Sequence, residues 1–285
     1  MPIKLPTPNS DLLTPNSNLL VLIPLILLLS CEREINIDYR TAAAHYVAEA
    51  SVTPEGTTVR LTTTQPMDTQ QPAYVDNAEV SITNNSLGGM TKQLSHTQHG
   101  VYTAYMRGMP GWSFTLDIHI DGQHYTSTTT MPDEARLASF RFVWKDVLSE
   151  RILFAEAVVD DHPNQNNYYF LHLYRNNIGY RWAVMRDDQD PGGQLKQLFS
   201  CTSERQMQSD AGDADVLHEG DVMRLDVRSI DHQAYDYLYS LQMTSASNTN
   251  PISNFTGGML GYFSAYSQVT RQITFHLDEV EEEEE

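Results

Sequence analysis

The sequence predicts a mainly β protein with two β-sandwich-like modules, of which the first is immunoglobulin-like and the second contains one short helix. Three observations predict this fold class. Polar and apolar residues alternate along many short segments, which is typical of strands with one buried face. Turn-forming residues separate these segments at intervals of about 8 to 12 residues, as in sandwiches. Only one segment follows the helical period instead.

The first module is expected to span residues 37–133. Its clearest element is a hairpin, in which residues 112–120 alternate, Asp121-Gly122 forms the turn and residues 124–130 return. Four other segments alternate or follow a turn signal. These expected strands are 46–52, 57–63, 77–82 and 100–105.

The second module is expected at residues 134–277, after the turn-forming sequence Met131-Pro132-Asp133. It is also strand-rich, because short apolar or alternating runs again lie between polar segments. The expected strands are 140–144, 152–159, 167–174, 179–185, 222–227, 259–267 and 270–276. Residues 206–215 are polar and acidic and are expected to form a loop.

One helix is expected at residues 231–244. Ala234, Leu238 and Leu241 recur at the i, i+4 and i+7 positions that share one helical face. Asp231 precedes them, and its carboxylate is a suitable N-cap for the free amides of the first turn. The pattern therefore predicts both the face that is buried and the residue at which the helix begins.

The N-terminal segment contains an apolar run that is too short to cross a membrane. Residues 19–29 form this run, and its 11 residues compare with the roughly 20 that a membrane-spanning helix needs. The run ends in LLSC at residues 28–31, and the whole resembles the signal of bacterial lipoproteins. The alternative is a buried core segment that ends at a cysteine, and Pro24 disfavours a helix there.

This resemblance predicts a lipid anchor. In such signals the chain is cut before the cysteine, which is then acylated, so residues 1–30 are expected to be a signal peptide and Cys31 the lipid-attachment site. Residues 31–36 are expected to form a tether. The protein is then anchored by lipid to the outer membrane, on its periplasmic or its cell-surface face.

The charge balance excludes one class of partner. Lys and Arg total 18 against 37 Asp and Glu, which gives a net charge of −19 and argues against nucleic acid. Acidic residues are concentrated in residues 278–285, which are expected to form a solvated, disordered tail. There are only two cysteines, and with Cys31 acylated the other, Cys201, is expected to be a small apolar residue near a strand end.

The best candidate for a metal site lies on the predicted hairpin. Asp117, His119 and Asp121 fall on one strand face at i, i+2 and i+4, and His124 lies across the turn, so two histidines and two carboxylates could converge. The same positions are also the outward, solvated face of an alternating strand. We favour the solvated face, so these four residues are weak candidates and no metal or cofactor is predicted.

A second acidic corner lies at Asp160, Asp161 and His162, close to several asparagines. Oxygen-rich loops of this kind can hold calcium. The spacing of an EF-hand is absent, and a plain turn is the favoured interpretation. The asparagines concerned are Asn164, Asn166 and Asn167.

Taken in order, the motifs resemble one known family, the domain-of-unknown-function 4249 family of Bacteroidota envelope lipoproteins. Its most specific match is NPISNFTGGMLGYFSAYS at residues 250–267. Other matching segments are Cys31, NAEVSI at 77–82, HGVYTA at 99–104, WSFTLDIHIDGQHYTSTTTMP at 112–132, DDHPNQNNYYF at 160–170 and YDYLYSL at 235–241. The resemblance implies two β-rich modules and a frequent genetic association with TonB-dependent outer-membrane transporters. It implies no established activity and no functional residues.

Two classes of function remain open. The first is a non-enzymatic accessory or binding lipoprotein that works with a TonB-dependent transporter, and the second is an envelope hydrolase acting on glycans. The sequence contains no recognised nucleophile, metal motif or cofactor loop, which favours the first class. Tyrosines left exposed are the expected contacts with a partner, although most are expected to be buried. The candidates are Tyr168, Tyr169, Tyr235, Tyr237 and Tyr239.

Overall fold

The computed structural model describes residues 44–65, 73–163, 165–187, 193–209, 216–247 and 250–282. The chain divides into two units, residues 1–41 and 42–285, and everything described below belongs to the second. The expected signal peptide, the lipid-attachment residue Cys31 and the tether lie outside the described residues. Within the described part of the chain, no helix is both long and apolar enough to cross a membrane.

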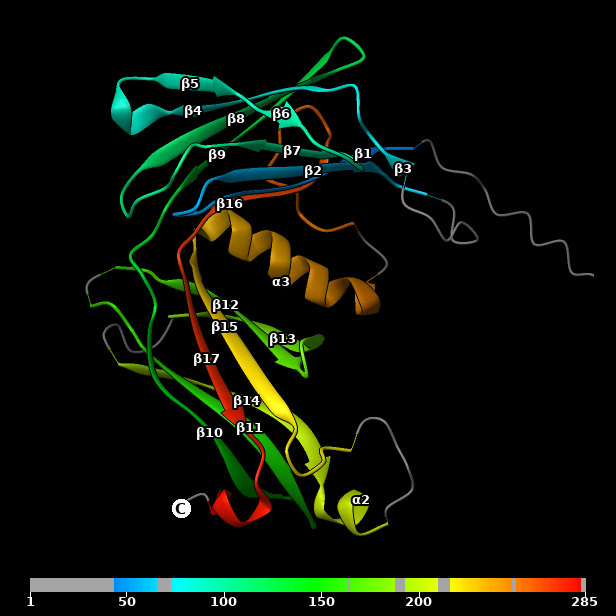
Figure 1. Ribbon diagram of the computed structural model, residues 1–285, viewed down its shortest axis with the longest axis vertical. Coiled ribbons are helices and arrows are strands. Elements are labelled where there is room, and N and C mark those ends of the chain that lie inside the picture. The colour runs from blue at the N-terminus through cyan, green and yellow to red at the C-terminus, as the bar shows by residue number, and fades with distance from the viewer. Residues whose placement is uncertain are drawn as a thin grey trace, which may run out of the picture. The chain divides into compact units, whose positions relative to one another are not determined.

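Two sheets form the first sandwich (Figure 1). Sheet A has the order β16 (Leu260–Ala265), β1 (Tyr46–Val52), β2 (Thr57–Thr63), β7 (Val101–Ala104) and β6 (Ser95–His96), with β3 (Ala73–Tyr74) also paired to β2. Sheet B has the order β5 (Met90–Gln93), β4 (Glu79–Asn84), β8 (Ser113–Ile120) and β9 (Gln123–Thr130), and the 3-10 turn η1 (Asn85–Leu87) joins β4 to β5.

The alternation in these strands places every second side chain in a shared core. Ile82 on β4 and Leu116 and Ile118 on β8 are fully buried, and they pack in one cluster with Val59 and Leu61 of β2. The predicted hairpin is β8 and β9, paired in register from Ser113 to Ile120. The prediction of a mainly β, sandwich-like fold is therefore confirmed.

The first sandwich is completed by a strand from far along the chain. β16 pairs in parallel with β1, from Val47 opposite Leu260 to Val52 opposite Ala265. Gly261 makes the approach possible, because its φ is +103° and a Cβ there would lie 1.9 Å from the carbonyl oxygen of Ala48.

This pairing differs from the predicted division of the chain at residue 133. Residues 260–265 were expected to belong with 134–277, but Phe263 and Ala265 are buried in the first core. The alternating pattern predicts that residues 259–267 form a strand, and it does not say which sheet the strand joins.

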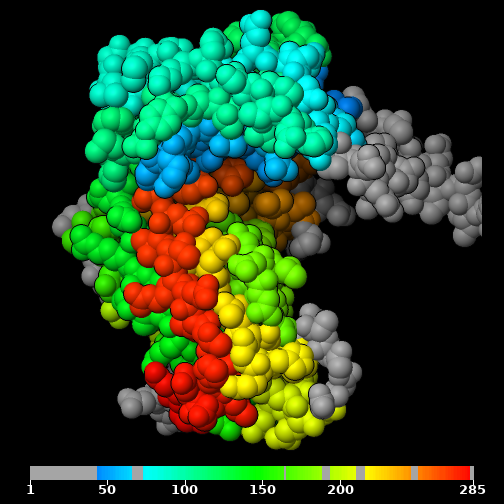
Figure 2. Space-filling view, viewed as in Figure 1, coloured from blue at the N-terminus to red at the C-terminus, as the bar shows by residue number. Residues whose placement is uncertain are grey.

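The second sandwich also consists of two sheets. Sheet C has the order β14 (Gln194–Ser203), β11 (Glu150–Asp160), β10 (Arg136–Val147) and β18 (Glu281–Glu282). Sheet D has the order β13 (Ile178–Arg186), β12 (Tyr168–Arg175), β15 (Val222–Ile230) and β17 (Gln268–Thr274), and Figure 2 shows β17 (red) beside β15 (yellow) on the surface. Their inner faces share a core that includes Phe142, Leu153, Leu171 and Leu225.

Helix α3 (His232–Ser247) packs on the outer face of sheet D and against β16, so it lies between the two sandwiches (Figure 1). Its buried side chains Ala234 and Leu238 contact Phe170 of β12. Asp231 caps it, since the backbone amide of Ala234 donates to Asp231 Oδ1 at 2.8 Å. The predicted helix and its N-cap are confirmed, but Leu241, the third residue of the predicted stripe, is 38% exposed.

A second, short helix was not expected. α2 (Glu204–Ser209) forms where the sequence predicts the start of a polar loop. Ser203 and Gln206 make a reciprocal capping box: the amide of Gln206 donates to Ser203 Oγ, and the amide of Ser203 donates to Gln206 Oε1. The serine followed three residues later by glutamine is the signal in the sequence that identifies this helix start.

The acidic end of the chain also differs from the prediction of a disordered tail. The 3-10 turn η2 (Leu277–Glu279) leads into β18, which pairs in parallel with β10. Glu281 forms an ion pair with Arg141, and Glu282 forms one with Arg151. The acidic side chains are thus used to attach the end of the chain to sheet C, as far as residue 282.

Candidate functional site

The four weak metal candidates do not converge. His124 Nε2 lies 2.8 Å from Asp117 Oδ1, and the ring of His119 stacks on that of His124 with centroids 4.4 Å apart. Asp121 instead accepts hydrogen bonds from Tyr46 and Asn77. Among the residues that the structure describes, no group of three or more His, Cys, Asp or Glu could hold a metal ion.

The acidic corner at residues 160–162 has a structural role. Asp161 accepts a hydrogen bond from the hydroxyl of Tyr169 at 3.1 Å, and His162 Nε2 lies 2.8 Å from the carbonyl oxygen of Glu134. The side chain of Asn167 donates to the carbonyl oxygen of His162. These contacts fix the entry to β12, while Asn164 lies outside the described residues. Cys201 is buried on β14, and burial raises the pKa of its thiol to about 12.

Of the tyrosines considered as contacts, only Tyr239 is strongly exposed, at 46%. Tyr169, Tyr235 and Tyr237 are buried and Tyr168 is half-buried. Tyr239 lies one turn before Met243 on α3, and the nearby Ile252 is 62% exposed. We call Tyr239, Met243 and Ile252 the exposed end of α3.

Sheet D carries an unexpected concentration of cations. Its four strands contain six arginines and a single acidic residue, although the whole chain has a net charge of −19. The arginines are Arg175, Arg181, Arg186, Arg224, Arg228 and Arg271, and the acid is Asp226. This sheet therefore has the opposite charge to the molecule as a whole.

The strand register brings part of this charge together with aromatic rings on the outer face. One row across the sheet runs from Trp182 through His172 and Asp226 to Thr270. The neighbouring rows place Tyr174 opposite Arg224 and Phe170 opposite Arg228. We call this set the arginine–aromatic face: Phe170, His172, Tyr174, Trp182, Arg224, Asp226 and Arg228.

Arg228 is held in place without an acidic partner. Its guanidinium lies 4.6 Å from the ring centroid of Tyr266 and 5.5 Å from that of Phe170, and its Nε donates to Gln268 Oε1 at 2.8 Å. No carboxylate of the described residues is within ion-pair distance of it. The cation is thus positioned by rings and an amide, and no carboxylate in the described part of the chain pairs with it.

Arg224 is only partly compensated. It lies over the ring of Tyr174, 4.2 Å from the centroid, and its Nε is 3.4 Å from Asp226 Oδ1. That approach lacks hydrogen-bond geometry, so within the described structure the buried Nε has no hydrogen-bond partner. Asp226 is itself buried and accepts a hydrogen bond from Thr270 at 2.9 Å.

His172 adds an uncharged donor to the face. Burial lowers its pKa, and the nearby Arg228 lowers it further, so the ring is neutral at neutral pH. Its Nδ1 lies 2.9 Å from the hydroxyl of Tyr174, and with Tyr174 as the donor the proton of the ring is on Nε2. A Cβ at Gly179 would lie 3.3 Å from that Nε2, so the glycine leaves this atom approachable.

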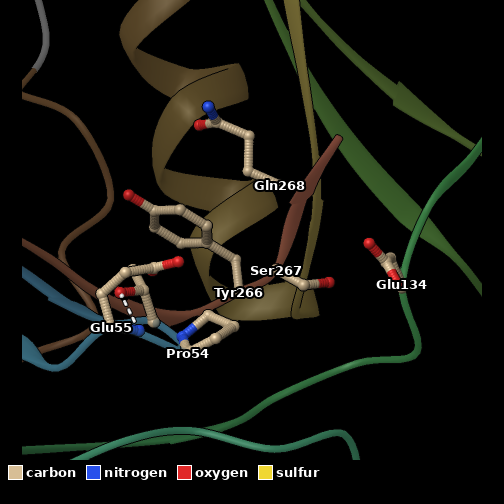
Figure 3. Close-up of a pocket in the computed structure, with 7 residues that line it drawn as sticks. Pro54, Glu55, Glu134, Tyr266, Ser267 and Gln268 are labelled. Carbon is tan, nitrogen blue, oxygen red and sulfur yellow. Dashed lines mark hydrogen bonds between the residues drawn. The ribbon is translucent and has the colours of Figure 1, made fainter. Parts of the chain in front are cut away.

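A hollow of about 480 Å³ adjoins this face at the junction of the two sandwiches (Figure 3). It is lined by Thr53, Pro54, Glu55, Glu134, Tyr266, Ser267 and Gln268. Figure 3 shows the side chain of Ser267 directed towards Glu134, and Ser267 Oγ is buried with no hydrogen-bond partner among the described residues. We call it the junction hollow, and Tyr266 and Gln268 connect it to Arg228.

The arginine–aromatic face was not predicted from the sequence. The signal was present as alternation, with His172 and Tyr174 on the polar side of one strand and Arg224 and Arg228 on the polar side of another. The alternation does not reveal that these two strands are neighbours, because paired strands can be far apart in the sequence. Here Asn176, directly after β12, accepts a hydrogen bond from Val222 at the start of β15, 46 residues later. The pairing had to be observed.

Comparisons with known proteins give a family and no activity. A family model described as a domain of unknown function (DUF4249) matches residues 32–272. None of the curated proteins matches the chain. A segment of two fibronectin type-III domains from chicken tenascin is similar in structure, with 11% sequence identity, coverage of 81% of this chain and 99% of that chain, and a TM-score of 0.21.

Proposed function

The chain belongs to the family of the domain of unknown function DUF4249, as its motifs predict, and we propose that it is a non-enzymatic binding lipoprotein of the outer membrane that works with a TonB-dependent transporter. The observation that carries the binding role is the arginine–aromatic face. A protein with so many carboxylates could neutralise Arg228 with one of them, yet the described structure holds this cation with rings and an amide. A positioned, uncompensated guanidinium is suited to an external partner.

The anchor is supported by the sequence at residues 28–31. Acylation of Cys31 would confine the protein to the membrane that holds the transporter, which raises their effective concentration for each other. Replacement of Cys31 by Ala is expected to release the protein from the outer-membrane fraction. If the variant is found in the outer-membrane fraction to the same extent as wild type, the lipid anchor at Cys31 is contradicted.

The exposed end of α3 is the proposed contact with the transporter. Tyr239, Met243 and Ile252 are apolar and exposed, and aromatic and methionine side chains are enriched in the centres of protein interfaces. Tyr239 and Met243 lie on the helix that packs against both sandwiches, and the amide of Ile252, which follows the helix, donates to Ser240 Oγ at 2.8 Å. A partner bound there would therefore contact the element that joins the two sandwiches.

Site-specific crosslinking tests this contact. Tyr239→Cys and Ile252→Cys in the lipidated chain are expected to crosslink to the transporter, and Leu148→Cys, an even more exposed position in the β10–β11 turn, is not. Cys201 can be left in place because its buried thiol is unreactive. Equal crosslinking from all three positions, or none from α3 together with unchanged uptake after deletion of the protein, would refute the accessory role.

One observation favours the second candidate, an envelope hydrolase acting on glycans. Glu55 and Glu134 both line the junction hollow, and paired carboxylates are the usual catalytic groups of glycosidases. The test is turnover of glycans by the purified chain and by Glu134→Gln. Under the binding proposal neither protein releases reducing ends, and release by wild type that is lost in Glu134→Gln would favour the hydrolase instead.

A further inference from the structure

We propose that the arginine–aromatic face binds an acidic oligosaccharide, with Arg224 and Arg228 each holding one of its anionic groups. This assignment rests on the proposed binding function and names the chemistry of the ligand.

The charge of the face requires an anion. Arg228 has no carboxylate partner in the described structure, and Arg224 shares one buried carboxylate in poor geometry. The planar guanidinium matches carboxylate, sulfate and phosphate groups through parallel hydrogen bonds. The stacking of each arginine on an aromatic ring fixes its orientation before the ligand arrives, which reduces the entropy lost on binding.

The spacing requires at least two anionic groups. Arg224 and Arg228 are four residues apart on β15, and at roughly 3.3 Å per residue their backbones are about 13 Å apart. The buried Asp226 lies between them and disfavours an anion at the centre of the face. A single carboxylate cannot reach both arginines, whereas a chain with repeated acidic groups can.

The hydrogen-bonding capacity of the face favours a sugar chain over an acidic peptide. β12 and β15 each pair with strands on both sides, so their main-chain groups are already used within the sheet. An extended peptide obtains much of its affinity from main-chain hydrogen bonds at a sheet edge, which this face does not offer. Side chains such as His172 and the exposed Gln272 can instead bond to the hydroxyls of a sugar.

The surroundings of the face favour a discrete ligand over a lipid surface. α3 packs on the same side of sheet D, covering Phe170 and Trp182, and a helix with its side chains stands roughly 10 Å high. A flat bilayer would meet α3 before it reached His172 and Arg224. A narrow chain molecule can lie alongside the helix and contact both arginines.

Direct binding measurements test the proposal. Isothermal titration of the full chain in detergent would use two acidic probes, hexagalacturonate and a sulfated heparin hexasaccharide, a neutral probe, maltohexaose, and a peptide probe, hexaglutamate. We expect at least one acidic sugar to bind, and the comparison of the two shows whether carboxylate or sulfate groups are preferred. Maltohexaose and hexaglutamate are expected to bind at least about tenfold more weakly. Salt is expected to weaken the binding.

Variants assign the binding to this face. Arg228→Gln and Arg224→Gln are each expected to weaken binding about tenfold or more. Arg271→Gln is the matched control, because Arg271 is an exposed arginine of the same sheet whose position pairs with the core residue Leu225, away from the face. It should bind as wild type does. Unfolding curves identify any variant that fails to fold. In that case Gln272→Ala, a milder change at an exposed edge position of the face, replaces it, and this variant is also expected to weaken binding.

Several results would overturn the proposal. These are no binding of either acidic sugar by wild type, equal binding of maltohexaose or hexaglutamate, and equal loss of affinity in Arg271→Gln and Arg228→Gln. None of these depends on a transporter. A failure here would therefore leave the crosslinking at α3 intact, and a failure of that crosslinking would leave the ligand assignment intact.

Discussion

Sheets C and D of the second sandwich both present arginines on their surfaces, and the two sheets differ in whether a key arginine is paired with a carboxylate. On sheet C, Arg141 lies 2.9 Å from Glu156 and also pairs with Glu281, while Lys196 Nζ is 3.0 Å from the other oxygen of Glu156. On sheet D, Arg228 stacks between two rings and has no acidic partner among the described residues. Sheet D also contains a neutralised arginine, Arg175, which lies 2.6 Å from Asp221. The contrast is therefore between Arg141, which is neutralised, and Arg228, which is left available.

The difference teaches how to separate cations that stabilise the fold from cations that are available to bind. A guanidinium whose acid is buried beneath it contributes to folding, because removal of either partner leaves charge or polarity unsatisfied. Replacing a guanidinium that is held by aromatic rings costs the protein little stability. Such a guanidinium keeps unused hydrogen-bond donors, which are available to a ligand. The following substitutions should have effects in that order.

The largest effect is expected on sheet C from Glu156→Gln. Glu156 is buried, and the substitution removes two charge-assisted interactions and leaves Arg141 and Lys196 close together without the anion. We expect the free energy of unfolding to fall by roughly 2 to 3 kcal/mol, measured by urea denaturation. Glu150→Gln, an exposed glutamate of the same strand, is the control, and an equal loss there would contradict the assignment.

Acid should remove the same contribution from the wild type. Burial by itself raises the pKa of Glu156, but hydrogen bonds from Lys196 and Arg141 outweigh it and hold the pKa below its usual value. A carboxyl with a lowered folded-state pKa stabilises the protein above the unfolded-state pKa and loses that contribution as the pH falls through the folded value. Below about pH 4 the difference in stability between wild type and Glu156→Gln should shrink. A difference that stays constant down to pH 2 would argue against a charged Glu156.

Removal of the last five residues should have a moderate effect. A chain that ends at Val280 lacks the ion pairs of Glu281 with Arg141 and of Glu282 with Arg151. Because both glutamates are more than half exposed, we expect a loss of about 1 kcal/mol or less, and a smaller loss at high salt. Thermal unfolding at low and high salt measures this, and a loss that is independent of salt would point to the backbone pairing of β18 instead.

The smallest effect on stability is expected on sheet D from Arg228→Gln. The substitution removes only the contacts of a partly exposed side chain with Tyr266 and Phe170 and leaves no buried acid unpaired, so the free energy of unfolding should stay within about 0.5 kcal/mol of wild type. Arg141→Gln, the matching change on sheet C, should cost more because it leaves Glu156 with one fewer partner. Equal losses in the two variants would remove the distinction between the sheets.

Local patterns predicted the elements better than their assembly. The period of two identified β8, β9 and most other strands, and Asp231 with the spacing of Ala234 and Leu238 identified α3. These signals are local, since they depend on side chains a few residues apart. The capping box at Ser203 and Gln206 is an equally local signal, although it was not used to predict α2.

Pairing between distant strands could not be predicted in this way. The pattern at residues 259–267 fits a strand in either sandwich, and only the close approach at Gly261 fixes it to β1. For the same reason Arg224 and Arg228 could not be placed beside His172 and Tyr174 in advance. The acidic end was misjudged because composition indicates solvation, whereas the cationic partners Arg141 and Arg151 are remote in sequence.

The attachment of β16 to β1 has a consequence for biogenesis. The strand that completes the first sandwich follows β1 by more than 200 residues, so β1 has an open edge during synthesis until β16 emerges. Phe263 also reaches the first core only at that stage. Neither core is complete before these late residues are made, because Phe263 belongs to the first core and Phe275 to the second, and until then the exposed edge of β1 is a site for mispairing with other chains. The edge of β1 that pairs with β16 therefore stays open from the synthesis of residue 52 to that of residue 265.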